Sequence, residues 1–231
     1  MNRRDLLLGG LAAGASLAMP ARAQDEQALL KQAFDALAGE GAAMAGSVPP
    51  VEPAAPPSPA YLSKVLEIAR REVSRAGAAV WRRDIVGVAD FAQPSSRPRL
   101  HFANLENGTV RSFLVAHGRG SDREHDGWLK HFSNIPGSEA TSRGAYLTCE
   151  WYTGKYGTSI RLQGLDPDNF TARERAIVMH PAWYAAPDMI AKYGKLGRSE
   201  GCFAMAPSDF NEALWRLSGG RLLFADRIGE A

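Results

Sequence analysis

Cysteine is scarce in this 231-residue sequence, and charge of neither sign is in large excess. Two cysteines are too few for a disulfide-dense scaffold or for a zinc ribbon built from several cysteine pairs. A formal net charge of +2 is too small to indicate a partner such as nucleic acid or an anionic membrane surface. The hydrophobic and charged fractions, 45% and 23%, are typical of globular proteins and exclude disorder along the whole chain.

The uncharged run near the N-terminus is too short and too rich in small residues to be a good membrane span. It covers residues 6–19, follows Arg3-Arg4 and precedes Ala21-Arg22-Ala23. This order of a basic, an apolar and a small-x-small segment is typical of a secretory signal cut after Ala23. The paired arginines also resemble a twin-arginine signal. We therefore expect residues 1–23 to be a signal peptide, the protein to be exported to the periplasm or cell envelope, and no membrane span to remain after cleavage.

Residues 24–60 are expected to form a helix and a linker in front of the folded domain. Apolar residues at helical spacing predict a short amphipathic helix over residues 25–40. Residues 49–59 then hold six of the fourteen prolines, a composition typical of a semi-rigid spacer. The folded domain is accordingly expected to begin near Tyr61 and to cover residues 61–231.

The periodicity of that domain predicts a mostly β fold with helices at its edges. One apolar stripe predicts a helix over residues 61–76 that lies on the core. The Asn107-Gly108 pair between two alternating runs predicts a β-hairpin. Strands are expected at residues 85–89, 100–105, 109–115, 146–151, 158–162, 177–179 and 221–225, with a helical turn at 172–176 and a helix at 209–217.

Cys202 and His180 together contain the parts of a nucleophile and its base. A free thiol has a pKa of about 8.5 and attacks only as the thiolate, so it needs a group that takes its proton. Gly201 before the cysteine permits a tight turn whose peptide N–H groups can face a substrate oxygen. Two other interpretations remain open: a disulfide between Cys202 and Cys149, and a buried inert thiol.

A second grouping has the composition of a metal site. It contains His117, His125, Asp126 and His131. The helical His-x-x-x-His spacing of zinc peptidases is missing, which favours a solvated charged loop over a metal centre.

Several ordered blocks resemble the bacterial L,D-transpeptidases, in the branch whose active-site loop reads Gly-Arg-Ser-x-Gly-Cys. The loop itself is matched by Gly197–Cys202. Further blocks that match in order are Val115–Ser121, Phe132–Asn134, Pro136–Ser138, Arg143–Tyr146, Gly157–Leu165 and Arg175–His180. The sequence departs from the usual pattern in having Pro181 after the histidine, Phe203 after the cysteine and Thr141-Ser142 before Arg143-Gly144.

The resemblance implies a twisted β-sandwich catalytic domain with Cys202 as nucleophile and His180 as general base. It also implies an oxyanion hole made by the backbone N–H groups of Gly201 and Cys202. Ser199, or a backbone carbonyl, would orient the imidazole. The residues expected on the substrate side are Arg198, which would hold a carboxylate or brace the loop, His117, which would contact substrate or serve a structural hydrogen bond, and Ser133, Asn134 and Tyr184.

The implied reaction is peptidoglycan cross-linking without a cofactor or metal. The thiolate would attack the carbonyl of an L-residue bonded to a D-residue in a stem peptide, and an amine of a neighbouring stem would take the acyl group. Donor and acceptor stem peptides are thus the expected partners, and nucleic acid is not. The scissile bond is left open between stem residues 3–4 and 1–2. L,D-carboxypeptidase activity with water as acceptor, and a non-catalytic wall-binding module, are the alternatives.

Overall fold

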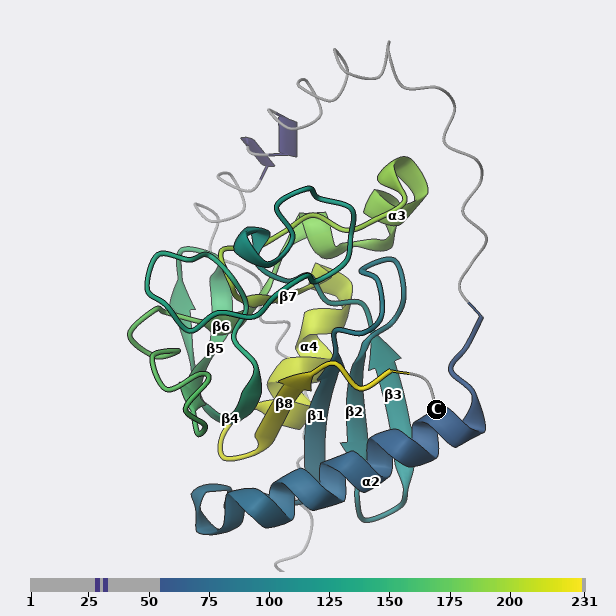
Figure 1. The fold of residues 1–231 in the computed structure, drawn as a ribbon, viewed down its shortest axis with the longest axis vertical. Helices are drawn as coiled ribbons and strands as arrows, with labels where there is room; N and C mark the ends of the chain where they lie inside the picture. Colours follow the sequence, from purple (N-terminus) through teal and green to yellow (C-terminus); the bar gives the residue numbers. More distant parts are fainter. Residues whose placement is uncertain (1–27, 30, 33–54, 230–231) are drawn as a thin grey trace, which may run out of the picture.

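The computed structural model describes residues 28–29, 31–32 and 55–229 (Figure 1). The predicted signal peptide, and most of the helix and linker predicted for 24–60, lie outside these residues. The four described residues between 28 and 32 are helical. No helix in the described part of the chain is both long and apolar enough to cross a membrane.

Helix α2 (Pro59–Ala76) opens the folded part of the chain and confirms the predicted helix, with an earlier start. The Ser58 side chain accepts a hydrogen bond from the Tyr61 backbone N–H at 3.2 Å, and Pro59 occupies the first turn, where its missing N–H costs nothing. The helix ends at Gly77, whose φ of 57° suits glycine. The short 3₁₀ helix η1 (Gly77–Ala79) follows.

In the part of the chain that the structure describes, eight strands form one mixed sheet in the order β3-β2-β1-β8-β4-β5-β6-β7. The pairs β1–β8 and β6–β7 are parallel, and the other neighbours are antiparallel. The strands are β1 (Ile85–Asp90), β2 (Leu100–Asn104), β3 (Thr109–Phe113), β4 (Gly144–Gly154), β5 (Gly157–Gly164), β6 (Val178–Pro181), β7 (Phe203–Met205) and β8 (Leu222–Asp226). The mostly β prediction and the 107–108 hairpin are therefore confirmed.

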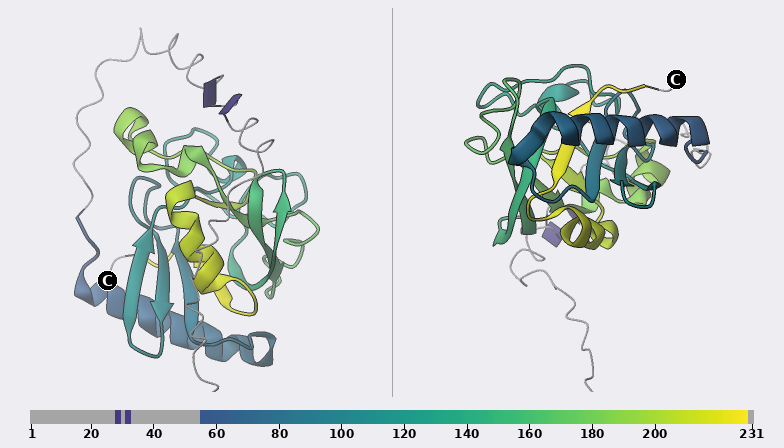
Figure 2. Two further views of the ribbon diagram at one scale, coloured as in Figure 1. Left: turned by 180° about the vertical axis from the view of Figure 1, so that it is seen from behind. Right: turned by 90° about the horizontal axis from the view of Figure 1, so that it is seen from below.

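The central strand β1 is buried along its whole length because each of its faces packs on a helix. Val86 and Val88 join the cluster under α2, while Ile85 and Ala89 join the larger cluster that contains residues of α4 (Pro207–Leu217). This alternation is what the period of two along a strand requires. Figure 2 shows the two helices on opposite sides of this part of the sheet.

The sheet curves until its two edges meet. Beyond β3 the chain continues to Ala116, which forms an isolated antiparallel bridge with Ala204 of β7, and Gly118 bridges Ser199. The curved sheet encloses the larger hydrophobic cluster, whose members come from every strand. This closure places residues 116–118 beside the loop that precedes β7.

Five short elements were not predicted. They are η1, η2 (Arg119–Ser121), η3 (Trp183–Ala185), α3 (Pro187–Tyr193) and β7. The helical turn expected at residues 172–176 is limited to one i→i+4 hydrogen bond, from the Arg175 N–H to the Thr171 carbonyl at 2.8 Å, within a run of turns. It stops being helical because Ala176 adopts a φ of 54°, which lies in the left-handed region.

A buried polar chain ties α2 to the sheet. Tyr61 Oη donates to Asp90 Oδ2 at 2.7 Å, so the 3.0 Å contact with His101 Nε2 is one in which the imidazole N–H donates to the hydroxyl. His101 Nδ1 then accepts from Ser112 Oγ at 2.8 Å. Asp90 Oδ1 accepts from the backbone of Ile228 at 2.8 Å, which connects the C-terminal segment to the same carboxylate.

Replacing Tyr61 by Phe should lower the free energy of unfolding by about 1–3 kcal/mol, because Asp90 Oδ2 loses the hydroxyl donor while it stays buried. Urea unfolding measures the change. Ser63→Ala on the exposed side of α2 is the matched control and should stay within about 0.5 kcal/mol of wild type. Equal unfolding midpoints for Tyr61→Phe and wild type would contradict this role of the hydroxyl.

Candidate active site

Cys202 and His180 come together because β6 and β7 are parallel neighbours. Met179 lies opposite Phe203, and His180 lies opposite Ala204. Cys202, one residue before β7, continues this register opposite Val178. Since alternate residues of a strand share a face, the side chains of Cys202 and His180 project to the same side of the sheet from adjacent strands.

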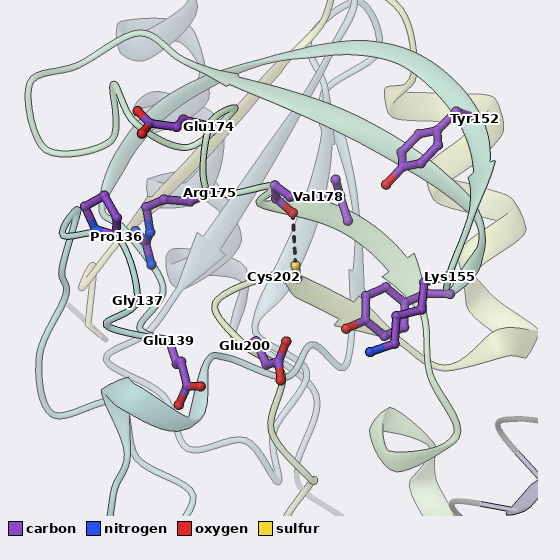
Figure 3. A pocket seen from close by; sticks show the side chains of 12 residues that line it. Pro136, Gly137, Glu139, Tyr152, Lys155, Glu174, Arg175, Val178, Glu200 and Cys202 are labelled. Atoms are coloured by element: carbon purple, nitrogen blue, oxygen red, sulfur yellow. Dashed lines mark hydrogen bonds between the residues drawn. The ribbon is translucent and has the colours of Figure 1, made fainter.

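Cys202 lies at a cavity of about 610 Å³ (Figure 3). Four segments of the chain build it: residues 136–139, the tip of the β4–β5 hairpin, the turn before β6, and the loop before β7. Its lining includes three carboxylates, two cationic groups and two tyrosines. The lining residues are Pro136, Gly137, Glu139, Tyr152, Lys155, Tyr156, Glu174, Arg175, Ala176, Val178, Glu200 and Cys202.

The Cys202 thiol is almost completely buried and protonated in the resting site. Its Sγ donates to the Ala176 carbonyl at 3.7 Å. Burial raises the pKa of this thiol to about 11, opposed by a backbone hydrogen bond from Val178 and by the charge of Arg175. Both cysteines are free, so the disulfide alternative is not realised, and Cys149 Sγ contacts the Leu147 carbonyl at 3.7 Å instead.

His180 is held in one tautomer by a backbone carbonyl. Its Nδ1 lies 3.0 Å from the Pro181 carbonyl, which only accepts, so Nδ1 carries the proton and Nε2 has a free lone pair. Tyr156 stacks on the ring at 4.3 Å between centroids, and Tyr184 meets it edge-on at 6.5 Å. Burial lowers the pKa of His180 to about 4, so the imidazole is neutral at physiological pH.

The path of the loop Gly197–Cys202 depends on Gly201. Its φ is 111°, and a Cβ there would lie 2.7 Å from Ile177 Cδ1 and 2.8 Å from the Ala140 carbonyl oxygen. Both the conformation and the space therefore require glycine. Ser199 closes the loop from inside: its Oγ donates to the Cys202 carbonyl at 2.7 Å and accepts from the Gly201 N–H at 3.2 Å.

Two expectations for this loop concern hydrogen bonds that the structure shows. Of the two candidates to orient the imidazole, Ser199 and a backbone carbonyl, the structure has the Pro181 carbonyl at Nδ1, while the serine hydroxyl bonds within its own loop. The Gly201 N–H, expected to face an oxyanion, is bonded to Ser199 Oγ in this arrangement.

His117 is part of the core rather than of the cavity wall. Its Nδ1 lies 2.6 Å from Arg99 Nη2, and its Nε2 lies 3.3 Å from Asp122 Oδ2. Because a guanidinium only donates, Nδ1 accepts and Nε2 carries the proton. Burial lowers the pKa of His117 to about 4, which agrees with a neutral ring. Of the two expected roles, the structure supports the structural hydrogen bond.

The other expected substrate residues are also placed away from the cavity lining. Arg198 Nη1 donates to the backbone carbonyls of Asp122 and Arg123, so it braces the neighbouring loop. Ser133 and Asn134 line a separate, smaller depression with Arg143 and Asp168. Tyr184 packs edge-on against His180 and close to Gly197, and it is not one of the residues that line the cavity.

Sequence reasoning missed Arg175 and the hairpin residues Lys155 and Tyr156. Arg175 belongs to one of the blocks that resemble the transpeptidases, and this was the available signal. The two hairpin residues lie between Gly154 and Gly157, a turn that the sequence predicts without indicating what the turn covers. Figure 3 shows that Lys155 and Arg175 approach Cys202 from different sides of the cavity.

The side chains considered for a metal site do not form a set of ligands in the described part of the chain. His117 uses both ring nitrogens as described, and His125 Nε2 lies 3.0 Å from the Leu196 carbonyl. Among residues 28–29, 31–32 and 55–229, no three His, Cys, Asp or Glu side chains are grouped so that they could hold a metal ion.

A protein-family model matches this chain over residues 60–225, and its description is L,D-transpeptidase catalytic domain. This match covers most of the described residues and all elements that build the cavity. Among curated protein sequences, none matches the chain.

Solved structures give weaker similarities. L,D-transpeptidase 3 from Mycobacterium tuberculosis is 13% identical, with 62% of this chain and 60% of that chain covered and a TM-score of 0.41. An L,D-transpeptidase from Mycobacterium smegmatis is 13% identical, with 62% and 58% covered and a TM-score of 0.38. The helical cell shape determining protein Pgp2 from Campylobacter jejuni is 13% identical, with 75% and 58% covered and a TM-score of 0.41. The chain thus spans about three-fifths of the length of these proteins.

The buried histidines predict that stability falls in mild acid. Burial lowers the pKa values of His101, His117 and His180 to about 4, below the ordinary value of about 6.5. The unfolded chain therefore binds more protons, and the contribution is complete above pH 6.5 and lost as the pH falls towards 4. Three such groups give a slope of up to about 4 kcal/mol per pH unit in the free energy of unfolding.

Urea unfolding at constant ionic strength between pH 7 and 4.5 measures this slope. His101→Gln should reduce it by about one third. Replacing the exposed His131 by Gln is the control and should leave it unchanged. A free energy of unfolding that stays flat across this range would contradict neutral buried imidazoles.

Proposed function

This chain belongs to the L,D-transpeptidase catalytic domain family, and from that membership we propose that it is an exported peptidoglycan L,D-transpeptidase with Cys202 as its nucleophile. The observation that carries the proposal is the buried Cys202 thiol at the cavity, with the neutral imidazole of His180 on the same face of the neighbouring strand. The family implies peptidoglycan as substrate, and action on the cell wall implies a place outside the cytoplasm. The predicted signal at residues 1–23 supports export.

The first step transfers a proton as the carbon–sulfur bond forms. Thiol and imidazole are both neutral at rest, so Nε2 of His180 takes the proton as the Cys202 sulfur attacks the carbonyl carbon of the L-residue. The Pro181 carbonyl keeps the opposite nitrogen protonated, which leaves Nε2 free for this task. The stacked ring of Tyr156 favours the imidazolium that results.

The negative charge that develops on the carbonyl oxygen is assigned to the backbone N–H groups of Gly201 and Cys202. Each such donor contributes roughly 3 kcal/mol to transition-state stabilisation. For Gly201 to take part, its N–H must exchange the Ser199 hydroxyl for the substrate oxygen. At 3.2 Å this bond is at the long end of the usual range, which favours the exchange.

Collapse of the tetrahedral intermediate breaks the carbon–nitrogen bond of the L–D linkage. The imidazolium gives its proton to the departing D-amine, and the acyl group remains on sulfur as a thioester. An amine of a neighbouring stem then attacks the thioester, sulfur leaves, and the proton released by the amine returns to the thiol through His180. The product is a 3-3 cross-link if stem bond 3–4 is the donor, or a 1-3 cross-link if bond 1–2 is. Water in place of the amine gives L,D-carboxypeptidase activity.

Cys202→Ser should lower the formation of cross-linked dimers from disaccharide–tetrapeptide fragments by roughly three orders of magnitude or more, because a hydroxyl beside the same imidazole is a far weaker nucleophile. Fragmentation mass spectrometry of the products measures it, and the masses identify the donor bond. Cys149→Ser is the matched control and should keep wild-type activity.

Two other outcomes would change the conclusion. Shortened stems without dimers, dependent on Cys202, would assign a carboxypeptidase. Unchanged fragments together with Cys202-independent binding to sacculi would instead support the wall-binding module.

A further inference from the structure

Arg175 is a half-buried cation in the cavity wall with a role that the mechanism above leaves unassigned. It ends the turn that leads into β6, and its side chain lines the same cavity as Cys202 (Figure 3). The next residue, Ala176, provides the carbonyl that accepts the thiol hydrogen bond. Arg175 is thus related to the Cys202 sulfur in two ways: both residues line the same cavity, and the residue after Arg175 accepts the thiol hydrogen bond.

The guanidinium holds one segment of chain at four points. Nη1 donates to the Ser133 carbonyl at 2.8 Å and to Ser142 Oγ at 2.6 Å, while Nη2 donates to Ser138 Oγ at 3.2 Å and to the Ala140 carbonyl at 2.6 Å. All four acceptors belong to residues 133–142, which we call the wall segment. This segment lacks regular secondary structure, so these bonds are a large part of what fixes its path.

The wall segment lies against both the cavity and the loop Gly197–Cys202, which we call the nucleophile loop. Pro136, Gly137 and Glu139 line the cavity. The Ala140 carbonyl, which accepts from Arg175, is also the atom that would lie 2.8 Å from a Cβ at position 201. A displacement of the wall segment would therefore reach the loop that carries Cys202.

The charge of Arg175 is not balanced by the groups that hold it. The four partners are neutral oxygens, and they use four of the five N–H donors of the guanidinium, so its fork is not open to a substrate carboxylate. The ionisable groups that act on Arg175 are Tyr146 and Cys202. Burial raises the pKa of Tyr146, which stays neutral, so the sulfur is the atom there that becomes anionic.

We propose that Arg175 is a positioning residue of this site, which fixes the wall segment against the nucleophile loop and whose unbalanced positive charge stabilises the anionic form of the Cys202 sulfur. The proposal rests on the proposed function in taking Cys202 as the reacting group. The charge acts against Glu200, which disfavours the anionic sulfur. The other titratable groups that line the cavity are Glu139, Glu174, Lys155, Tyr152 and Tyr156; the His180 ring packs on Tyr156, and the Tyr184 ring packs on His180.

The test separates the charge from the hydrogen bonds. In a Cys149→Ser background, where Cys202 is the only thiol, the rate of alkylation by iodoacetamide is measured from pH 7 to 11. Arg175→Gln should shift the profile to higher pH and slow alkylation at pH 8 by up to roughly tenfold, the effect of one pKa unit. Arg175→Lys keeps the charge and should leave the profile close to that of the parent.

The hydrogen bonds are tested by Ser142→Ala, which removes one acceptor of Arg175 and leaves the charge. This variant and Arg175→Lys should raise KM with stem-peptide substrate more than they lower kcat, because the cavity wall loosens while the sulfur chemistry stays. Arg173→Gln, an exposed arginine on the same turn outside the cavity, is the matched control and should match the parent in both assays.

Identical alkylation profiles for Arg175→Gln, Arg173→Gln and the parent would overturn the electrostatic part. Unchanged KM in both Arg175→Lys and Ser142→Ala would overturn the positioning part. If Arg175→Gln fails to fold, the KM values of Arg175→Lys and Ser142→Ala still decide the positioning part. In that case, an alkylation profile of Arg175→Lys that is shifted to higher pH would contradict the electrostatic part. Alkylation does not require transpeptidation, so cross-linking by Cys202→Ser would refute the proposed function without erasing an Arg175 effect on the thiol.

Discussion

Parallel pairing of β6 with β7 is the constraint on which the arrangement of the site depends. Parallel neighbours need a crossover connection, and residues 182–202 provide it with η3, α3 and the nucleophile loop. Because successive side chains of a strand alternate, a shift of one residue in this register would turn Cys202 away from His180. The hydrogen bonds between two very short strands therefore hold the proposed catalytic pair.

So short a strand needs support on its other edge, and the segment after β3 supplies it. Ala116 bridges Ala204, Gly118 bridges Ser199, and His117 between them points inward to Arg99 and Asp122. Loss of His117 would remove one buried hydrogen-bond partner from the Arg99 guanidinium and one from the Asp122 carboxylate, which is costly in the interior. His117 thus contributes to the site at a distance, by anchoring the segment that covers the outer edge of β7.

Sequence patterns within a few consecutive residues predicted the strands, turns and helices that such patterns define. They did not predict the contacts that segments far apart in the sequence make with one another. The continuous apolar run of β1, the alternation of β2, the 107–108 turn and the stripe of α2 are each visible in a few consecutive residues. The three residues of β7 and the seven of α3 are too few to show a period. Cys202 and His180 could be proposed as nucleophile and base from residue type and resemblance, and the structure has them on adjacent strands. The role proposed for Arg175 could not be predicted in this way, because all its acceptors lie between Ser133 and Ser142, more than thirty positions away. For the same reason, the sequence analysis expected Ser133 and Asn134 at the substrate, whereas they belong to the wall segment and line a separate depression.

Burial of the thiol disfavours its ionisation and also shields it, and both effects are consistent with the proposed function of an exported enzyme. A low-dielectric site disfavours both the thiolate and the imidazolium, so the charge-separated pair forms only when another interaction offsets desolvation. The Val178 backbone bond and the Arg175 charge are present at rest and leave the pKa of Cys202 near 11. In the proposed mechanism, the remaining stabilisation comes with substrate, through the oxyanion contacts that form together with the carbon–sulfur bond. Without substrate the sulfur stays protonated and buried. Because oxidants attack the thiolate, this burial would protect the cysteine of an exported protein outside the reducing cytoplasm.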